Sequence, residues 1–301
     1  MFNLKETLHS SIKSALLVLK LIIPLFILAD TLLYFDVLKY ISFLFEPVTS
    51  LLNLPVEAAL GIAAGILFNL YAAIAFLAPL GLNAYEWTIL ATFLGVAHSL
   101  VVENTIMKKL GISHIYSAVL RVSIAFLSVL PITLLPKELF NGSASLATTN
   151  VALKYNSFTE MLQNSFVNAS YLSLKVIVLV TLIIFLMNYI KSTKIVQKYQ
   201  KKANTFFSII TGLILGITYG AGILINESKK GHLSKVDIFY IGTFLMIAHA
   251  IIEDTFLFVI FGANAWVVIS IRLLMAFIFS FILVKIYKNT HYTNVKISDS
   301  P

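Results

Sequence analysis

The chain has 301 residues, of which 59% are hydrophobic and 12% charged, with a formal net charge of +8. Soluble domains carry about 25% charged residues, and several segments here reach about 20 apolar residues, the length that spans a bilayer core. The sequence therefore predicts an all-α polytopic membrane protein that crosses the cell membrane several times. In a bacterium, we expect this membrane to be the inner one. Because the lysines lie mainly at segment ends, we expect the lipid bilayer as a partner and no nucleic acid.

The first half, residues 1–140, is predicted to form one transmembrane repeat. Its elements in order are a span at 12–34, a mixed segment at 37–52 that suits the membrane interface, and spans at 55–80, 86–107 and 113–136. The span at 55–80 carries Gly61 and Gly65, whose spacing of four favours close helix contact.

The second half, residues 169–290, is predicted to form the second repeat. Residues 141–168 are polar and are expected to link the halves, and residues 291–301 are expected to form a polar tail. The predicted spans are 169–190, 205–227, 236–260 and 264–288. Four glycines in 205–227 predict a loose or broken helix, namely Gly212, Gly216, Gly220 and Gly222.

The two halves match each other at a constant shift of 151 residues (249 − 98 = 151). His98 falls on His249 and Glu103 on Asp254, and the only two arginines of the chain, Arg121 and Arg272, also fall on each other. The same shift pairs four further sets, namely Gly61 with Gly212, Gly65 with Gly216, Glu86 with Asp237, and Gly111 with Gly262. We interpret this pattern as an internal duplication.

The lysine distribution favours two repeats of inverted topology. If all four long segments of each half crossed the membrane, the lysine-rich stretch 191–202 would lie outside, against the positive-inside rule. If the segment with the histidine and carboxylate enters and returns, or breaks, each half crosses an odd number of times and this stretch becomes cytoplasmic. Lys229, Lys230 and Lys235 are then expected outside. Inverted repeats with broken helices at mid-membrane are typical of secondary transporters.

Ionisable groups inside membrane segments are costly, at about 2.5–3.5 kcal/mol for a central Asp, Lys or Arg, so they tend to face each other or a cavity. On a regular helix His98 and Glu103 are five residues apart and do not share a face. If they converge, the backbone between them is irregular. The predicted substrate-binding or ion-binding set is His98, Glu103, Asn104, His249, Glu253 and Asp254.

Three readings of this set remain open. The carboxylates bind a proton or cation and the histidines bind a solute, or imidazole and carboxylate together form a divalent-metal path with His98, Glu103, His249 and Asp254 as ligands. In the third reading the residues are structural, with ion pairs between Glu103 and Arg121 and between Asp254 and Arg272 holding the bundle together. We favour this supporting role for the two arginines.

No enzyme is expected. The chain has no cysteine, which excludes disulfides, thiolate metal sites and cysteine nucleophiles. It also lacks the motifs His-Glu-x-x-His, Gly-x-Ser-x-Gly and Gly-x-x-x-x-Gly-Lys. Catalytic residues, cofactors and ATP-driven pumping within this chain are therefore not predicted.

The pattern resembles the nucleoside-recognition, or gate, domain family of integral membrane proteins. The residues that carry the resemblance are Gly61, Gly65, His98, Glu103, Asn104 and Gly111, with the counterparts Gly212, Gly216, His249, Asp254 and Gly262. Related gate domains occur in nucleoside transporters, ferrous iron transporters and spore maturation proteins. The resemblance implies broken helices at a substrate site.

Three functions follow as expectations. The first is a permease that moves a small polar solute, nucleoside-like by the resemblance, by alternating access coupled to H⁺ or Na⁺. The second is a divalent metal ion transporter similar to those for ferrous iron. The third is a non-transporting membrane assembly or scaffold protein. A homodimer is compatible with the small-residue helix faces.

Overall fold

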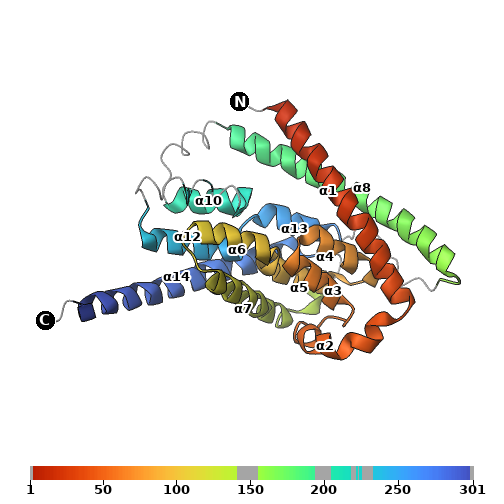
Figure 1. Cartoon of the computed structure of the whole chain (residues 1–301), viewed down its shortest axis with the longest axis horizontal. Helices are drawn as coiled ribbons and strands as arrows, with labels where there is room; N and C mark the ends of the chain where they lie inside the picture. The colour runs from red at the N-terminus through yellow and green to blue at the C-terminus, as the bar shows by residue number, and fades with distance from the viewer. Residues whose placement is uncertain are drawn as a thin grey trace.

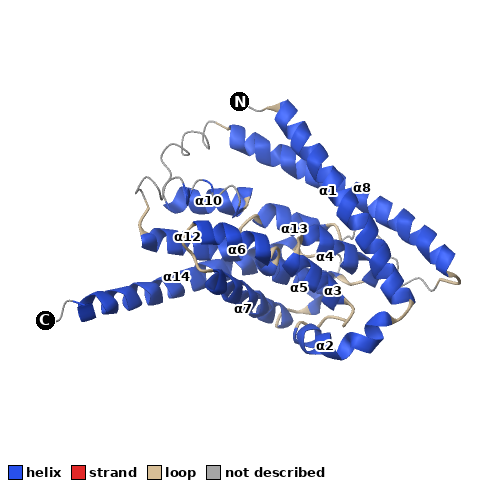
Figure 2. Ribbon diagram, viewed as in Figure 1, coloured by secondary structure: helices blue, strands red, loops and turns tan. Residues whose placement is uncertain are grey.

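In the computed structural model, the described residues are 3–140, 155–193, 205–217, 222, 224–225 and 233–298, and they contain helices and no strand. Figures 1 and 2 show the helices as one bundle, with a long pair, α1 (Leu4–Tyr34) and α8 (Phe158–Ser192), crossing one side of it. Within these described ranges, six helical stretches are long and apolar enough to cross a membrane. The predicted all-α polytopic membrane fold is confirmed.

The first repeat continues with α2 (Val37–Leu51), α3 (Ala58–Leu67), α4 (Leu70–Leu77), the 3₁₀ turn η1 (Ala78–Leu80), α5 (Ala84–Ala97), α6 (Leu100–Lys109), α7 (His114–Thr133) and η2 (Lys137–Phe140). The second contains α8, α10 (Thr205–Leu215), α12 (Lys235–Ala248), α13 (Ile251–Val259) and α14 (Ala265–Ser298). Helix α8 includes residues 158–168 of the predicted linker, while 141–154 lie outside the described residues. Helix α14 continues through most of the predicted tail.

Equivalent helices of the two repeats run in opposite directions. Near one end of the α1–α8 pair Asn188 Nδ2 donates to Thr7 Oγ1 at 3.1 Å, and near the other end Ser165 Oγ donates to Asp30 Oδ2 at 2.5 Å. Contacts at both ends between these low and high residue numbers mean that α1 and α8 are antiparallel. Helix α1 is the first helix of the first repeat and α8 is the first helix of the second. Because these equivalent helices are antiparallel, the repeats have inverted topology.

A second set of contacts leads to the same conclusion. Helix α14 runs parallel to α5, because Asn264 N–H donates to Thr88 Oγ1 and Arg272 Nη2 donates to the Gly95 carbonyl. It runs antiparallel to α12, since Phe277 packs on Phe244 and Tyr287 stacks on Phe239. Helices α5 and α12, which match at the shift of 151, are therefore antiparallel.

The Gly-rich segment forms a short helical hairpin and not a span. Gly61 lies against Leu77 and Gly65 against Ala73, which makes α3 and α4 antiparallel. The chain turns at Asn69, whose side chain accepts from the Ala72 N–H and caps α4. Each helix is too short to cross a bilayer. The prediction of a span at 55–80 is wrong, because an apolar run of that length can also fold back on itself.

The segment with His98 and Glu103 instead crosses as one interrupted helix. Helix α7 runs antiparallel along both of its parts: Ser117 bonds to Asn104 on α6, and Phe126 packs on Phe93 on α5 with ring centroids 5.0 Å apart. Residues 84–109 together are long enough to span. The predicted irregular backbone is confirmed, and the odd number of crossings comes from the α3–α4 hairpin.

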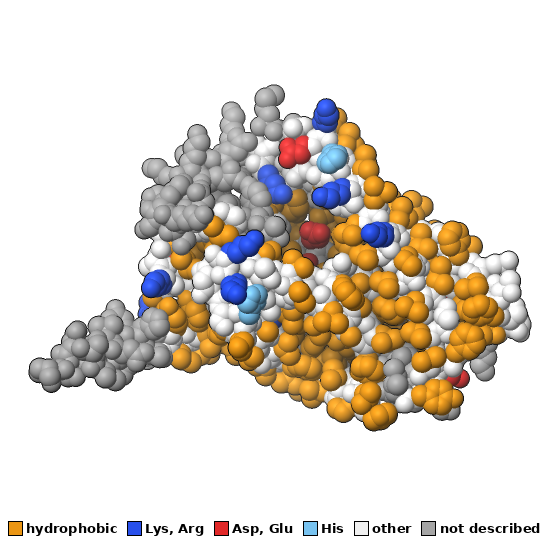
Figure 3. Space-filling model, in the orientation of Figure 1, with side chains coloured by type: hydrophobic (Ala, Val, Ile, Leu, Met, Phe, Trp, Pro, Cys, Tyr) orange, Lys and Arg blue, Asp and Glu red, His pale blue; other side chains and the backbone are white. Residues whose placement is uncertain are grey.

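With α5–α6 as a crossing and α3–α4 as a hairpin, the side of the membrane expected for Lys235 also changes. Ile112, at the turn after Lys108 and Lys109, contacts Gly242 on α12, and Tyr116 bonds to Thr243, so the α12 N-terminus lies on the side of these lysines. Figure 3 shows the described lysines gathered on one side of this face. The lysine distribution predicts Lys108 and Lys109 on the cytoplasmic side with the stretch 191–202, so the expectation that Lys235 lies on the opposite side from them is wrong. Lys229 and Lys230 lie outside the described residues.

Candidate functional site at two broken helices

Both interrupted helices break at the same two residues of the repeat. His98 ends α5 in extended conformation (φ −78°, ψ 162°) and Ser99 is left-handed (φ 50°) before α6. His249 (φ −82°, ψ 163°) and Ala250 (φ 44°) do the same between α12 and α13. A left-handed residue with a side chain costs about 1–2 kcal/mol, so two such residues at equivalent positions indicate that the break is built into the fold.

The helix starts and ends around the breaks are also repeated. Capping boxes begin α5 and α12, formed by Asn83 with Glu86 and by Ser234 with Asp237. Both repeats carry an acidic residue here, Glu86 and Asp237, because its side chain completes the capping box. After each second part of the broken helix, Gly111 (φ 85°) and Gly262 (φ 100°) take the left-handed conformation that glycine favours.

Each break leaves backbone carbonyls without a helical partner, and an arginine binds them. Arg121 donates to the carbonyls of Val96 and His98, at 2.7 Å each. Arg272 donates to the equivalent carbonyls of Ile247 (3.4 Å) and His249 (2.9 Å). Since uncapped carbonyls inside a bundle are costly, the arginines stabilise the interrupted conformation.

The same arginines form the predicted ion pairs. Arg121 Nη1 lies 2.7 Å from Glu103 Oε2, and Arg272 Nη2 lies 3.2 Å from Asp254 Oδ2. Both guanidinium groups are fully buried and both carboxylates nearly so. The geometry of the two predicted ion pairs is confirmed. The two charge-compensated pairs lie on opposite sides of one buried centre.

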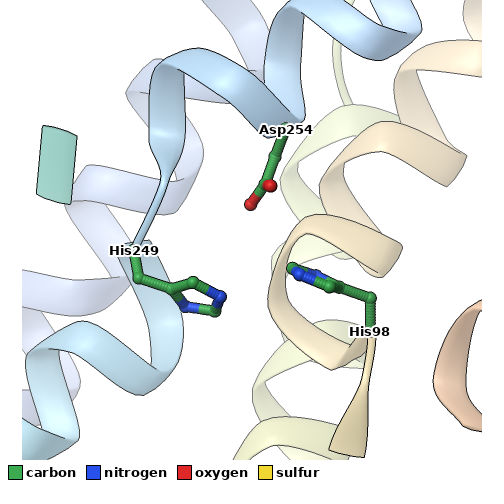
Figure 4. Close-up of side chains that lie close together, drawn as sticks. All are labelled: His98, His249 and Asp254. Carbon is green, nitrogen blue, oxygen red and sulfur yellow. The ribbon is translucent and has the colours of Figure 1, made fainter. Parts of the chain in front are cut away.

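The two histidines meet at this centre. Their rings lie 5.2 Å apart between centroids, and Figure 4 shows both rings and the Asp254 carboxylate pointing toward one space between the broken helices. Nε2 of His98 lies 3.2 Å from Glu103 Oε1, and Nε2 of His249 lies 3.2 Å from both Glu103 oxygens. Glu103 of the first repeat therefore joins the histidines of both repeats.

The other two predicted site residues lie beside the centre. Asn104 is buried and accepts a hydrogen bond from Ser117 at 2.5 Å, which ties it to α7. Glu253 interacts electrostatically with Asp254, His98 and Lys191, so it lies between the centre and the end of α8. Sequence analysis gives no role to Ser117, because a serine in an apolar helix carries no signal of its partner.

Ser99 holds the hairpin against the break and is a further residue that the sequence analysis does not identify. Its N–H donates to the Gly65 carbonyl at 2.9 Å and its hydroxyl donates to the Phe68 carbonyl at 2.8 Å. The tip of the α3–α4 hairpin is thereby fixed beside His98. Tyr71 on α4 interacts electrostatically with Glu253 and Asp254, so the hairpin of one repeat reaches the carboxylates of the other.

One known protein is similar over nearly the whole chain. It is the "uncharacterized membrane protein YvoD" of Bacillus subtilis (strain 168), 28% identical over 284 residues that cover 89% of this chain and 90% of the relative. No protein-family profile matches the chain, and no solved structure matches it. Together with the six candidate spans, the relative identifies the chain as a multi-pass membrane protein.

Proposed function

We propose that the protein is a permease that moves a small polar solute, nucleoside-like as the family resemblance implies, by alternating access coupled to H⁺ or Na⁺. The solute and the coupling ion are proposed to bind where the broken helices meet, at His98, His249, Glu103 and Asp254. Inverted repeats around a central site with interrupted helices are the architecture of many secondary transporters. Figure 3 supports an access route, since it shows a hollow with an acidic side chain at its floor and lysines around it.

The observation that carries this proposal is a difference of one helical turn between the repeats. In the first repeat, Ser99 N–H binds the Gly65 carbonyl and Leu94 faces Gly65. In the second, Ala250 N–H binds the Gly212 carbonyl at 3.3 Å, and Leu245 faces Gly212. Ser99 and Ala250 are equivalent, as are Leu94 and Leu245. Gly65, however, is equivalent to Gly216 (65 + 151 = 216).

The two Gly-rich helices thus sit four residues apart in register against equivalent broken helices. Four residues of α-helix are about 6 Å, or one turn. In the first repeat both glycines lie within α3, whereas in the second Gly212 lies in α10 and Gly216 follows the last residue of α10 with a φ of 87°. In both repeats the two glycine positions could accept the leucine of the broken helix. If each repeat adopted the register that the other has now, the protein would take the arrangement related to the present one by the two-fold symmetry of the repeats. That arrangement would be open to the opposite side of the membrane. One-turn shifts of packed elements are a known form of switching.

Uptake by proteoliposomes tests the proposal. The purified full chain would be reconstituted and supplied with radiolabelled nucleosides, nucleobases and small organic anions, under a pH gradient or a Na⁺ gradient. We expect saturable uptake of one solute class, abolished in Glu103→Gln and Asp254→Asn. Glu46→Gln, which changes an exposed carboxylate on α2, is the matched control and is expected to retain uptake. Absence of uptake for the whole panel, with folded protein and a copurifying partner, would support the scaffold alternative.

The register exchange has its own test. Because the chain has no cysteine, spin labels can be placed without background at the exposed residues Leu67 on the hairpin and Val101 on α6. We expect two populations of label distance that differ by several ångströms, with the ratio changed by the transported solute. A single, solute-independent distance would contradict the exchange.

A further inference from the structure

The hydrogen bonds from the two histidines to backbone carbonyls define which ring nitrogen faces the centre. Nδ1 of His98 lies 2.7 Å from the Leu94 carbonyl oxygen, and Nδ1 of His249 lies 2.8 Å from the Leu245 carbonyl oxygen. A carbonyl oxygen can only accept, so each Nδ1 carries the proton. In the neutral ring, each Nε2 then presents a lone pair to the centre. A histidine that binds a metal through one nitrogen and donates to a carbonyl from the other is arranged in this way.

The groups around the two Nε2 atoms are acceptors as well. Glu103 Oε1 lies 3.2 Å from both, and the ligand atoms of His98, His249 and Asp254 all lie within 4.8 Å of one another. All four residues are at most 7% exposed. Lone pairs and carboxylates that meet in a buried space need either a proton on each Nε2 or a metal ion between them, because each would otherwise face another acceptor.

We propose that His98, His249, Glu103 and Asp254 form a binding site for one divalent first-row transition-metal ion, held by Nε2 of both imidazoles and by carboxylate oxygens. In a tetrahedral site with bonds of about 2.0–2.1 Å, neighbouring ligand atoms are about 3.3 Å apart. The two separations of 3.2 Å between Glu103 and the histidines match this value. Asp254 is farther away and moves inward to complete the set.

The donor types select the class of ion. Imidazole nitrogen suits Zn²⁺, Co²⁺, Ni²⁺ and Fe²⁺, whereas Mg²⁺, Ca²⁺ and Na⁺ prefer oxygen ligands alone. The charges are also compatible. Arg121 and Arg272 balance Glu103 and Asp254, and Glu253 nearby supplies a third carboxylate. Each broken helix supplies its histidine at the break and one carboxylate from the helix that follows. A bound ion would therefore join the two repeats.

Metal binding does not require that the protein transports a solute. If the proposed permease is correct, the metal ion shares the four residues of its central site and is bound there with the solute, in addition to the coupling by H⁺ or Na⁺. If it is wrong, the ion still joins the two breaks and stabilises the fold. Binding must therefore be measured separately from uptake.

The test is a titration of the untagged, EDTA-treated full chain in detergent with CoCl₂ and ZnCl₂, using MgCl₂ for comparison. We expect one Co²⁺ per chain with the visible absorption of a tetrahedral site, displacement by Zn²⁺, and a higher melting temperature with Zn²⁺ but not with Mg²⁺. His98→Gln and His249→Gln should each weaken binding at least tenfold. His9→Gln, which changes an exposed histidine of α1, should bind as the parent does.

X-ray absorption of the Zn²⁺-loaded parent chain provides a second measurement that needs no variant. Two imidazole ligands in the first shell are expected. Absence of stoichiometric Co²⁺ binding, binding unaffected by both histidine substitutions, or a shell without imidazole would overturn the inference. Binding without uptake of any solute would leave the metal site standing and remove the permease, and uptake that persists after EDTA treatment in a chain that binds no metal would do the reverse.

Discussion

The two broken helices are alike in backbone and differ in how their arginines hold them. Within the part of the chain that the structure describes, Arg121 binds groups of its own repeat, namely the carbonyls of Val96 and His98 and the carboxylate of Glu103. Arg272 binds the matching groups of the second repeat and, in addition, the Gly95 carbonyl of the first at 2.6 Å. Duplication of a sequence thus produced one arginine that stabilises a break and one that also joins the two breaks.

The carboxylates show the opposite difference. Glu103 reaches both histidines as well as its arginine, whereas the shorter Asp254 side chain pairs, among the described residues, with Arg272. At the centre, Glu103 of the first repeat and Arg272 of the second therefore each cross to the other repeat. The centre is asymmetric although its sequence is duplicated.

The largest expected effect follows from this comparison. Arg272→Gln leaves Asp254 as a buried, unpaired charge and releases three carbonyls, which should cost about 3–5 kcal/mol of stability. Arg121→Gln should cost less, because Glu103 keeps two histidines. Thermal unfolding in detergent measures both. Adding Asp254→Asn to Arg272→Gln should recover part of the loss, and equal losses in the two single variants would contradict the assigned asymmetry.

Gly95 provides a sharper test of the link between repeats. A Cβ at this position would lie 2.9 Å from Arg272 Nη1 and 3.0 Å from Cζ, so Gly95→Ala should displace the guanidinium and cost about 1–3 kcal/mol. The equivalent residue in the second repeat is Met246 (95 + 151 = 246), so the two repeats differ at this position. Gly222→Ala is the matched control, because its Cβ would have no neighbour within 4 Å. An unchanged melting temperature in Gly95→Ala would argue against the crossing contact.

Ser99 makes a hydrogen bond that the second repeat lacks, since Ala250 has no hydroxyl. Ser99→Ala should remove the bond to the Phe68 carbonyl and cost about 1 kcal/mol, with faster amide exchange around the hairpin tip. Thr105→Ala is the control, because that hydroxyl is exposed and bonds within its own helix. Equal exchange in the parent and Ser99→Ala would show that the hydroxyl does not fix the hairpin.

The smallest effect is expected at the left-handed residue of the second break. Ala250→Gly should stabilise the protein by about 0.5–1 kcal/mol, because glycine adopts a positive φ without strain. Ala248→Gly, two residues earlier in regular helix α12, should instead destabilise it by about 1 kcal/mol. A lower melting temperature for both variants would mean that the backbone at Ala250 is not left-handed.

The sequence predicts the residues of the centre better than it predicts their supports. The five-residue spacing of His98 and Glu103 indicates a broken helix if the two converge, as they do, and the arginines and carboxylates within apolar segments indicate the two ion pairs. The hairpin is missed because α3 and α4 together have the length and apolarity of one span. Asn69, a helix N-cap residue in the middle of that run, was a usable signal. The carbonyls that bind the arginines could not be found, since every residue carries one.

The contact from Arg272 to the Gly95 carbonyl has a consequence for biogenesis. Arg272 lies in α14, about 170 residues after the break in α5–α6 (272 − 98 = 174), so during synthesis this break reaches the membrane long before its partner exists. The first repeat should therefore remain incompletely ordered until α14 has been inserted. Nascent chains that end before residue 265 are expected to be sensitive to proteases near residue 95 and to be substrates for membrane quality control.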